Sequence, residues 1–253
     1  MAAAKPPGYV YHRQGVPVAW FYMREARPTF PGDAGDVADI TGRVAAGERT
    51  DVGCDFVPGP RGKRLAFDGA QFVNFGKQPS LRFTEAVTVS ARVQTTNAGS
   101  SFRGICANEG GWSIFLIDNE YCFYDWFANV INHSGFMAND GLEHTLTTVF
   151  RGGVAGGSEF FVDGRKVGVG TWTNNDGPSG LVQIGNNGGI TQQYSGFIDD
   201  VRVFDYPLSA AEIRREAADP FWRLRPPRRK TAWFAGSPTP TPTASPAALL
   251  MAM

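Results

Sequence analysis

The chain has 253 residues, of which 42% are hydrophobic and 13% aromatic, so it can bury a substantial core and is not disordered overall. Its length fits one large β domain or two small ones. Its 31 Gly and 17 Pro, with few helix-period runs, favour short strands joined by turns and exclude a parallel α/β fold. Its 24 basic and 24 acidic groups balance, yet residues 220–253 hold five basic groups and no acidic one.

The first expected strand is Val16–Tyr22, and the Gly-, Asp- and Arg-rich stretch from there to Lys63 is expected to be a long surface connection. Leu65–Phe67 and Phe72–Phe75 then predict a strand pair around a turn at Asp68–Gly69. In Val87–Val93, valine and alanine alternate with threonine, serine and arginine, which predicts a strand with one core face and one solvent face.

Phe102–Asn108, Trp112–Ile117 and Tyr121–Phe127 predict three strands of a meander, with turns at Gly110–Gly111 and Asp118–Asn119. Further strands are expected at Thr145–Phe150, Leu181–Ile184 and Tyr194–Phe204.

Asp163–Gly164 suits the tight turn of a hairpin, here between Glu159–Val162 and Arg165–Val169. One short helix follows, with Ser209 and Glu212 forming a capping box, Leu208 packing on Ile213, and an end at Asp219–Pro220.

About a dozen short strands and one helix predict an all-β fold, a two-sheet antiparallel jelly-roll sandwich with a short C-terminal helix and an extended tail. We divide the chain into an N-terminal arm (1–15), the sandwich domain (16–218), a basic and aromatic docking segment (219–235) and a flexible Pro/Thr-rich tail (236–253). Residues 1–8 lack the apolar core of a secretory signal, and no stretch is long enough to span a membrane.

Several motifs, in this order and spacing, resemble those of one family. They are Leu65–Gly69 with Val73 and Gly76, Val87–Val93, Phe160–Gly164, Ile184–Gly185, Gly196–Val203 and Leu208–Ile213. Together they are similar to the laminin-G-like jelly roll of the concanavalin A-like lectin and glucanase superfamily, over about residues 16–218. The resemblance implies two curved antiparallel sheets and a binding or adhesion module for carbohydrate or protein.

The segment from Ala218 to Pro226 and the arginines after it resemble the ending of single-domain members encoded among bacteriophage structural genes. This resemblance implies a virion structural protein, such as a capsid decoration, head fibre or tail-associated protein. It would be made in the bacterial cytoplasm without a signal peptide and displayed on the virion surface. Its expected partners are other virion proteins and a host-surface glycan, in a homo-oligomer or multicopy assembly.

The basic and aromatic segment predicts a docking surface. Its residues are Phe221, Trp222, Arg223, Arg225, Arg228, Arg229 and Trp233. It can dock on its own acidic domain or on a neighbouring subunit, and we favour docking over nucleic-acid binding because aromatic and proline residues dilute the charge.

Trp112, Tyr124 and Trp126 are the candidate sugar-binding residues, because flat rings stack on the apolar faces of sugars. In residues 121–127 one alternating row must face the interior, and we expect the Tyr124 and Trp126 row to face outward. Asn174, Asn186 and Asn187, in expected loops, are added as candidate hydrogen-bonding residues.

The motif Gly196–Asp200 resembles one that binds a structural calcium in several superfamily members, which implies Asp199 as a ligand, with Asp200 pointing to the opposite face. The three histidines show no second ligand at metal spacing, and the three cysteines are expected to be buried free thiols. We therefore expect no zinc site.

Glycan-hydrolysing relatives carry closely spaced carboxylates on one strand. Asp118 and Glu120 flank a turn, and Glu120 and Asp125 would face opposite sides of a strand. The sequence therefore predicts a non-enzymatic protein with a lectin-like domain, and the alternatives are a bacterial carbohydrate-binding module and, least favoured, a glucanase.

Overall fold

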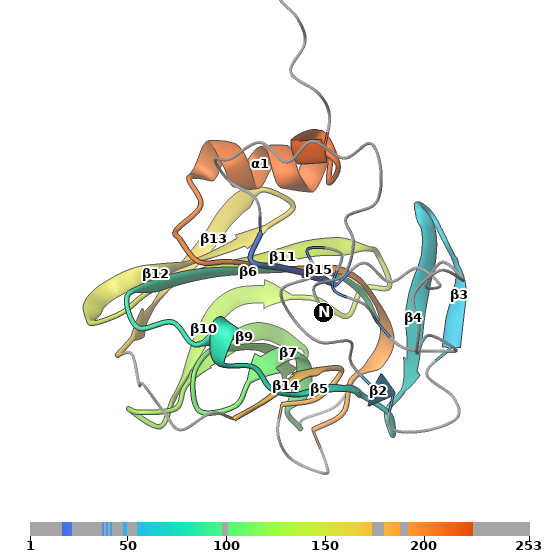
Figure 1. Ribbon diagram of the computed structural model, residues 1–253, viewed down its shortest axis with the longest axis horizontal. Helices are drawn as coiled ribbons and strands as arrows, with labels where there is room; N and C mark the ends of the chain where they lie inside the picture. The colour runs from blue at the N-terminus through green and yellow to red at the C-terminus, as the bar shows by residue number, and fades with distance from the viewer. Residues whose placement is uncertain are drawn as a thin grey trace, which may run out of the picture.

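The computed structural model describes residues 17–21, 37, 39, 41, 48–49, 55–97, 101–173, 180–187 and 192–224. In this part of the chain two antiparallel β-sheets face each other, and the helix α1 lies across the outside of one of them (Figure 1). The all-β sandwich predicted from the sequence is therefore confirmed. No helix among these residues has the length and apolar character needed to cross a lipid bilayer.

The sheet beneath α1, called sheet I below, has eight strands among the described residues. In spatial order they are β13 (Arg165–Trp172), β12 (Val154–Val162), β11 (His144–Arg151), β6 (Ala86–Gln94), β15 (Ser195–Phe204), β4 (Gly62–Asp68) and β3 (Asp55–Gly59), with β1 (Ala19–Phe21) also paired to β15. The predicted hairpin is β12 and β13, and its turn residues Asp163 and Gly164 both have positive φ angles, of 49° and 79°.

The opposite sheet, called sheet II, has seven strands among the described residues. In spatial order they are β10 (Val130–Met137), β9 (Glu120–Asp125), β8 (Ser113–Ile117), β7 (Arg103–Asn108), β14 (Leu181–Ile184), β5 (Val73–Lys77) and β2 (Glu48–Arg49). The strands β7 to β10 are neighbours in chain order, so the predicted meander is confirmed.

The main core lies between the two sheets, where strand alternation directs one row of side chains from each strand. Val89 and Val93 of β6 meet Tyr121 and Phe123 of β9 in this layer, and all four side chains are at most 1% exposed. Two described cysteines, Cys106 and Cys122, are buried free thiols as expected, while Cys54 lies outside the described residues.

The predicted pairing across Asp68–Gly69 is wrong, because β4 belongs to sheet I and β5 to sheet II. At this point the chain crosses from one sheet to the other. The Asp68 carboxylate accepts a hydrogen bond from the Ala70 N–H at 2.9 Å, and the Gln71 side chain accepts one from the Asp68 N–H at 3.1 Å. These short-range bonds look like those of a hairpin turn, although the strands on either side have different partners.

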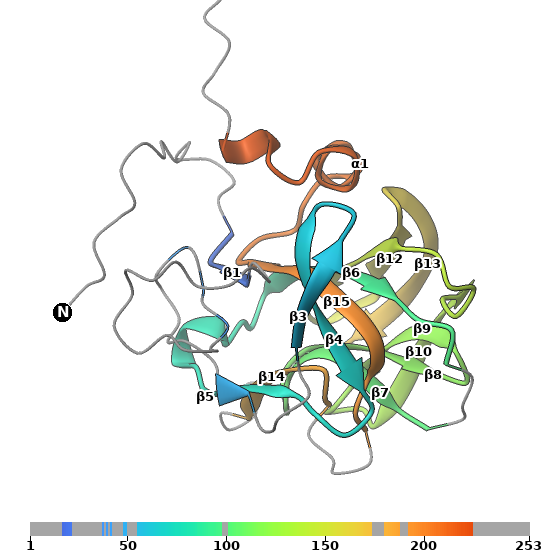
Figure 2. The ribbon, with the colours of Figure 1, turned by 90° about the vertical axis from the view of Figure 1, so that its right-hand side faces the viewer.

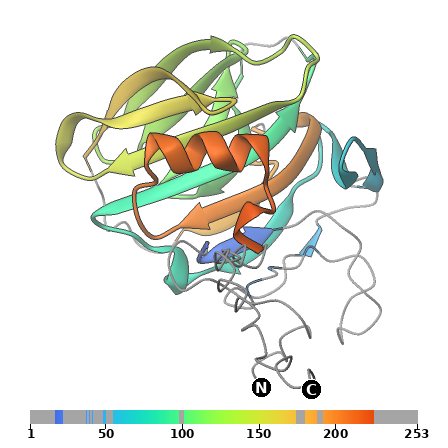
Figure 3. The same ribbon diagram turned by 90° about the horizontal axis from the view of Figure 1, so that it is seen from above.

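The outer face of β6 is also not solvent-exposed as predicted, because Thr88, Ser90 and Arg92 are at most 6% exposed. The helix α1 (Ala210–Ala218) and the chain leading to it cover this face (Figure 3). A second apolar cluster fills the space between helix and sheet. It consists of Val149, Phe161, Phe204, Leu208 and Ile213, with Tyr206 against it.

The start and end of α1 match the sequence prediction. The Ser209 hydroxyl accepts from the Glu212 N–H at 3.3 Å, and the Glu212 carboxylate accepts from the Ser209 N–H at 2.9 Å. The helix ends at Ala218, with Asp219 as its C-cap. Short 3₁₀ turns lie at Pro79–Leu81 and, just after α1, at Trp222–Leu224.

Beneath α1 runs a buried series of charges that connects the helix to sheet I, called the charge network below. Arg202 of β15 forms ion pairs with Asp200 and with Glu216 of α1, and Glu216 also pairs with Arg223. All four side chains are at most 5% exposed. Because each charge has a partner, the network fixes the helix against the sheet without leaving an isolated ion in the interior.

The change Glu216→Gln tests this network. It leaves Arg202 and Arg223 without their shared carboxylate, and we expect it to lower the free energy of unfolding by about 3 kcal/mol. Urea unfolding followed by tryptophan fluorescence measures the loss. The matched change Asp205→Asn, at an exposed position on the same surface, should leave stability unaltered. Equal stability of the two variants would contradict an anchoring role.

Candidate functional site

Three aromatic side chains lie together on the outer face of sheet II: Phe102, Tyr124 and Trp126. We call them the aromatic platform. The rings of Tyr124 and Trp126 meet edge to face with centroids 4.8 Å apart, and Phe102 meets Tyr124 in the same way at 6.2 Å. Each of the three is half-buried, and Phe102 also packs on the fully buried Phe115. The platform is therefore a rigid, partly accessible aromatic surface.

The alternation of β9 produces this arrangement, because Tyr121 and Phe123 point into the core and Tyr124 points outward. The alternation stops at Asp125, where the strand ends. Alternation predicts that Phe127 points into the core together with Tyr121 and Phe123. This prediction is wrong, because Phe127 lies in the turn beyond the strand and is 69% exposed.

Asp125 holds the turn that carries Trp126. Its buried carboxylate accepts hydrogen bonds from the N–H groups of Phe127 and Ala128 at 3.1 Å, and from the N–H and hydroxyl of Thr173 at 2.8 Å. The Tyr124 hydroxyl donates to Asn129 in the same turn. These bonds fix the Trp126 ring beside Tyr124, which reduces the entropy lost when a ligand binds there.

Trp112 does not belong to this surface, and its prediction as a sugar-stacking residue is corrected. Its side chain is fully buried between the sheets, and its indole N–H donates to the Leu81 carbonyl at 3.0 Å. The residue immediately precedes β8, where an inward-facing aromatic residue and an outward-facing one have the same sequence signature.

The candidate asparagines lie away from solvent or outside the described residues. Asn186 and Asn187 are at most 3% exposed, and the side-chain oxygen of each is buried without a hydrogen-bond partner. Asn174 lies outside the described residues. The backbone of Asn186 and Asn187 packs against Gly104 of β7, where a Cβ would come within 2.0 Å of the Asn186 carbonyl carbon, so this loop lies closely against sheet II.

Three residues of the predicted docking segment contact the domain of their own chain. Arg223 is 5% exposed and paired with Glu216, the Trp222 indole donates to Glu216 at 2.9 Å, and Phe221 stacks on Trp20 with ring centroids 6.2 Å apart. Arg223 and Trp222 thus contact the acidic Glu216 of their own domain, and Phe221 packs on one of its aromatic rings. Arg225, Arg228, Arg229 and Trp233 lie outside the described residues.

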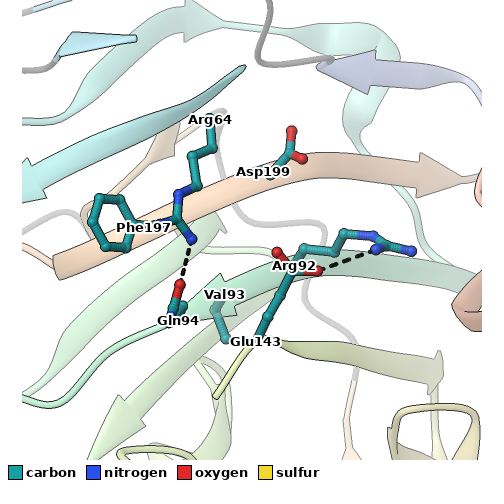
Figure 4. Close-up of a pocket in the computed structure, with 7 residues that line it drawn as sticks. All are labelled: Arg64, Arg92, Val93, Gln94, Glu143, Phe197 and Asp199. Atoms are coloured by element: carbon teal, nitrogen blue, oxygen red, sulfur yellow. Dashed lines mark hydrogen bonds and ion pairs between the residues drawn. The ribbon is translucent and has the colours of Figure 1, made fainter. Parts of the chain in front are cut away.

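Asp199 lies in a small pocket on the outer face of sheet I, beyond the end of α1 (Figure 4). Its side chain, with those of Arg64 and Arg92, projects from three neighbouring strands. Asp199 Oδ1 is buried without a hydrogen-bond partner. Burial and the neighbouring Asp200 raise the pKa of the Asp199 carboxyl to about 7, although Arg92 opposes this change.

The expected opposite orientation of Asp200 is wrong. Asp200 has a φ of 57° and lies where the register of β15 against β6 shifts. This bulge inserts one residue, so Asp199 and Asp200 both lie on the outer face of the sheet. Asp200 Oδ2 lies 3.5 Å from Arg92 Nε.

The pocket does not suit the calcium ion implied for Asp199. Calcium takes six to eight oxygen ligands. Here the Gln94 side-chain oxygen accepts from Arg64, and Glu143 pairs with Arg92 at 3.4 Å, so Asp199 supplies the remaining carboxylate beside two guanidinium groups. We assign no metal to it.

The raised pKa makes stability depend on pH. The ordinary carboxyl pKa is 3.8 and the folded-state pKa about 7, so the folded protein binds this proton more tightly, and stability falls as pH rises from about 4 to about 7. Asp199→Asn removes this loss. Above pH 7 we expect urea unfolding of this variant to give a free energy of unfolding higher than that of the unchanged protein by roughly 2–4 kcal/mol. Below pH 4 we expect the two free energies to be equal. The exposed change Asp118→Asn should show neither effect, and a pH-independent difference for Asp199→Asn would contradict the assignment.

One group of residues with metal-ligating side chains was not predicted from the sequence. Glu120, Cys122 and His133 bring their ligand atoms within 4.8 Å of one another on the outer face of sheet II. They are close because β9 and β10 pair with His133 opposite Cys122. Eleven positions separate Cys122 and His133 in the chain, so no short motif links them. The sequence shows only that Glu120 and Cys122, two positions apart, lie on the same face of a strand.

A sandwich of two antiparallel sheets is an architecture found in lectin domains. The family model described as the concanavalin A-like lectin/glucanases superfamily, of the laminin G type, matches residues 67–214, which is more than half of the chain. The chain belongs to this family.

Solved structures show the same fold at low sequence identity. The binding domain of paraclostridial mosquitocidal protein 1 superposes with a TM-score of 0.62 at 13% identity, covering 81% of this chain and 52% of that one. Domain 4 of AbnA, a GH43 extracellular arabinanase from Geobacillus stearothermophilus, in complex with arabinotriose, gives 0.59 at 16% identity, covering 79% and 98%.

The ligand-binding domain of botulinum neurotoxin serotype D, in complex with N-acetylneuraminic acid, gives a TM-score of 0.57 at 12% identity, covering 80% of this chain and 50% of that one. The chain thus spans about half of the toxin domains and nearly all of the arabinanase domain. No protein with a curated function matches the chain by sequence.

Proposed function

We propose that the protein is a non-enzymatic carbohydrate-binding module that holds a sugar ring against the aromatic platform of Tyr124 and Trp126. The observation that carries the proposal is the platform itself, because aromatic rings held in place by a hydrogen-bonded turn present a pre-positioned surface on which a sugar can stack.

The structures of similar fold support the class of ligand. The arabinanase domain and the neurotoxin domain were each solved with a saccharide, arabinotriose and N-acetylneuraminic acid. This chain matches nearly the whole arabinanase domain, so a sandwich of this kind can present a sugar site, whereas it matches only half of the neurotoxin domain.

The acidic residues near the platform support a binding module over a glucanase. Asp125 is 1% exposed and its oxygens accept four hydrogen bonds from the turn and Thr173, while Glu120 accepts from the Gly135 N–H and pairs with His133. Neither is placed as a free nucleophile or acid across a glycosidic bond, which a retaining glycosidase requires at about 5–5.5 Å separation.

A glycan array on the purified chain, followed by calorimetry with the best binder, tests this function. We expect Trp126→Ala to weaken binding by at least tenfold, which corresponds to about 1.4 kcal/mol, because it removes a stacking surface. Phe127→Ala is the matched control, since its ring is 69% exposed on the same turn and outside the platform. Binding of no array glycan, or equal losses in both variants, would refute the platform as a sugar site.

We further propose that the domain is displayed on a phage particle, as a capsid decoration, head fibre or tail-associated protein. The resemblance of Ala218–Pro226 to the ending of phage structural proteins supports this setting. The docking of Phe221–Arg223 on their own domain supports a role for residues beyond Leu224 in attachment, since the earlier part of the segment is occupied.

Electron cryo-microscopy of particles from the source culture, with mass spectrometry of their proteins, tests the virion setting. We expect the chain at defined capsid or tail positions in many copies, with the outer face of sheet II exposed. A particle preparation that lacks the chain would refute the virion role while leaving the sugar-binding proposal standing.

A further inference from the structure

Glu120, Cys122 and His133 form a compact group on the outer face of sheet II, called the triad below. The Cys122 sulfur lies 3.4 Å from His133 Nδ1, and the same nitrogen lies 2.9 Å from Glu120 Oε2. All three ligand atoms are within 4.8 Å of one another. Glu120 and Cys122 share a face of β9 as alternate residues, and the register places His133 directly across from Cys122 on β10.

These distances are close to those of a tetrahedral zinc site. Zinc binds sulfur at about 2.3 Å and imidazole nitrogen or carboxylate oxygen at about 2.0–2.1 Å, so tetrahedral angles separate sulfur from nitrogen by about 3.5 Å and nitrogen from oxygen by about 3.4 Å. The observed sulfur–nitrogen distance agrees, and the nitrogen–oxygen distance of 2.9 Å is that of a hydrogen bond. The third distance, from the Cys122 sulfur to a Glu120 oxygen, is within 4.8 Å, so all three ligand atoms would move closer together around the ion.

The surroundings hold the triad in position. The second oxygen of Glu120 accepts a hydrogen bond from the Gly135 N–H at 2.6 Å, at the bulge where the register of β10 shifts. Hydrogen bonds that orient ligand side chains are typical of metal sites.

We propose that Glu120, Cys122 and His133 bind one Zn²⁺ ion, with Cys122 Sγ, His133 Nδ1 and a Glu120 oxygen as the three protein ligands. Thiolate and imidazole together select zinc over magnesium or calcium. The His133 side chain is 51% exposed, so the fourth position faces solvent. On the same face of β9 and β10, the cross-strand pair next to Cys122 and His133 is Tyr124 and Ile131. The ion would therefore lie about 7 Å along the strand from Tyr124, a member of the platform.

Cobalt substitution of the full-length chain tests this site. Co²⁺ bound to a thiolate gives an intense near-ultraviolet charge-transfer band, and four-coordinate Co²⁺ gives strong visible bands, so the spectrum reports both the sulfur ligand and the geometry. We expect one ion per chain, displaced by Zn²⁺, and loss of the charge-transfer band in Cys122→Ser. Cys106→Ala is the control, because Cys106 faces the core between the sheets, and it should keep the band.

His133→Gln separates metal binding from folding, because its half-exposed ring can be replaced without opening the core, whereas Cys122→Ser alters a buried side chain. Zinc affinity from competition with a chromophoric chelator should fall by more than the roughly 10–100-fold that loss of an outer hydrogen-bond partner costs. Thermal unfolding with and without Zn²⁺ should show stabilisation of the unchanged chain only. An unaltered affinity in folded His133→Gln, or a thiolate band that survives in Cys122→Ser, would overturn the proposal.

Discussion

The buried ion pairs of Glu216 determine which face of this sandwich is free. Glu216 pairs with Arg202 of the sheet and with Arg223 of the segment after α1, and none of the three is more than 5% exposed. An unpaired charge at this depth would cost several kcal/mol of stability. The helix α1, the segment with Arg223 and sheet I are therefore expected to unfold together. The helix held by this network covers much of the outer face of sheet I, on the side away from sheet II (Figure 2). The aromatic platform and the triad both lie on sheet II.

Local sequence signals predicted the elements well because their causes are local. The capping box at Ser209, the tight turn at Asp163 and the alternation of β6 depend on residues a few positions apart, and each forms as expected. The sheet to which a strand belongs depends on distant partners. The turn at Asp68 therefore predicted a hairpin where the chain crosses between sheets, and the alternation of β6 could not reveal the helix that covers its outer face.

The candidate site divides in the same way. Alternation along one strand predicted that Tyr124 and Tyr121 point to opposite faces, and the structure decides which of them faces outward. The burial of Trp112 likewise depends on where sheet I lies. A single inserted residue at Asp200 reversed the expected direction of its side chain, because a bulge changes the face of a residue without a strong sequence signature. Cys122 and His133 meet only through the register of β9 and β10, which no spacing rule describes.

The stacking of Trp20 on Phe221 brings the two ends of the described domain together. Trp20 belongs to β1, three positions after Pro17, where the described residues begin. Its indole N–H donates to Asp200 at 2.6 Å. Phe221, on which it stacks, follows α1. Chain entering at residue 17 and chain leaving at residue 224 therefore do so on the same side of the sandwich, over sheet I. A scaffold joined to either end would hold the domain on the side of sheet I. Many copies fixed side by side would then all expose sheet II, and the weak binding of single domains to a multivalent ligand would add up to a strong avidity.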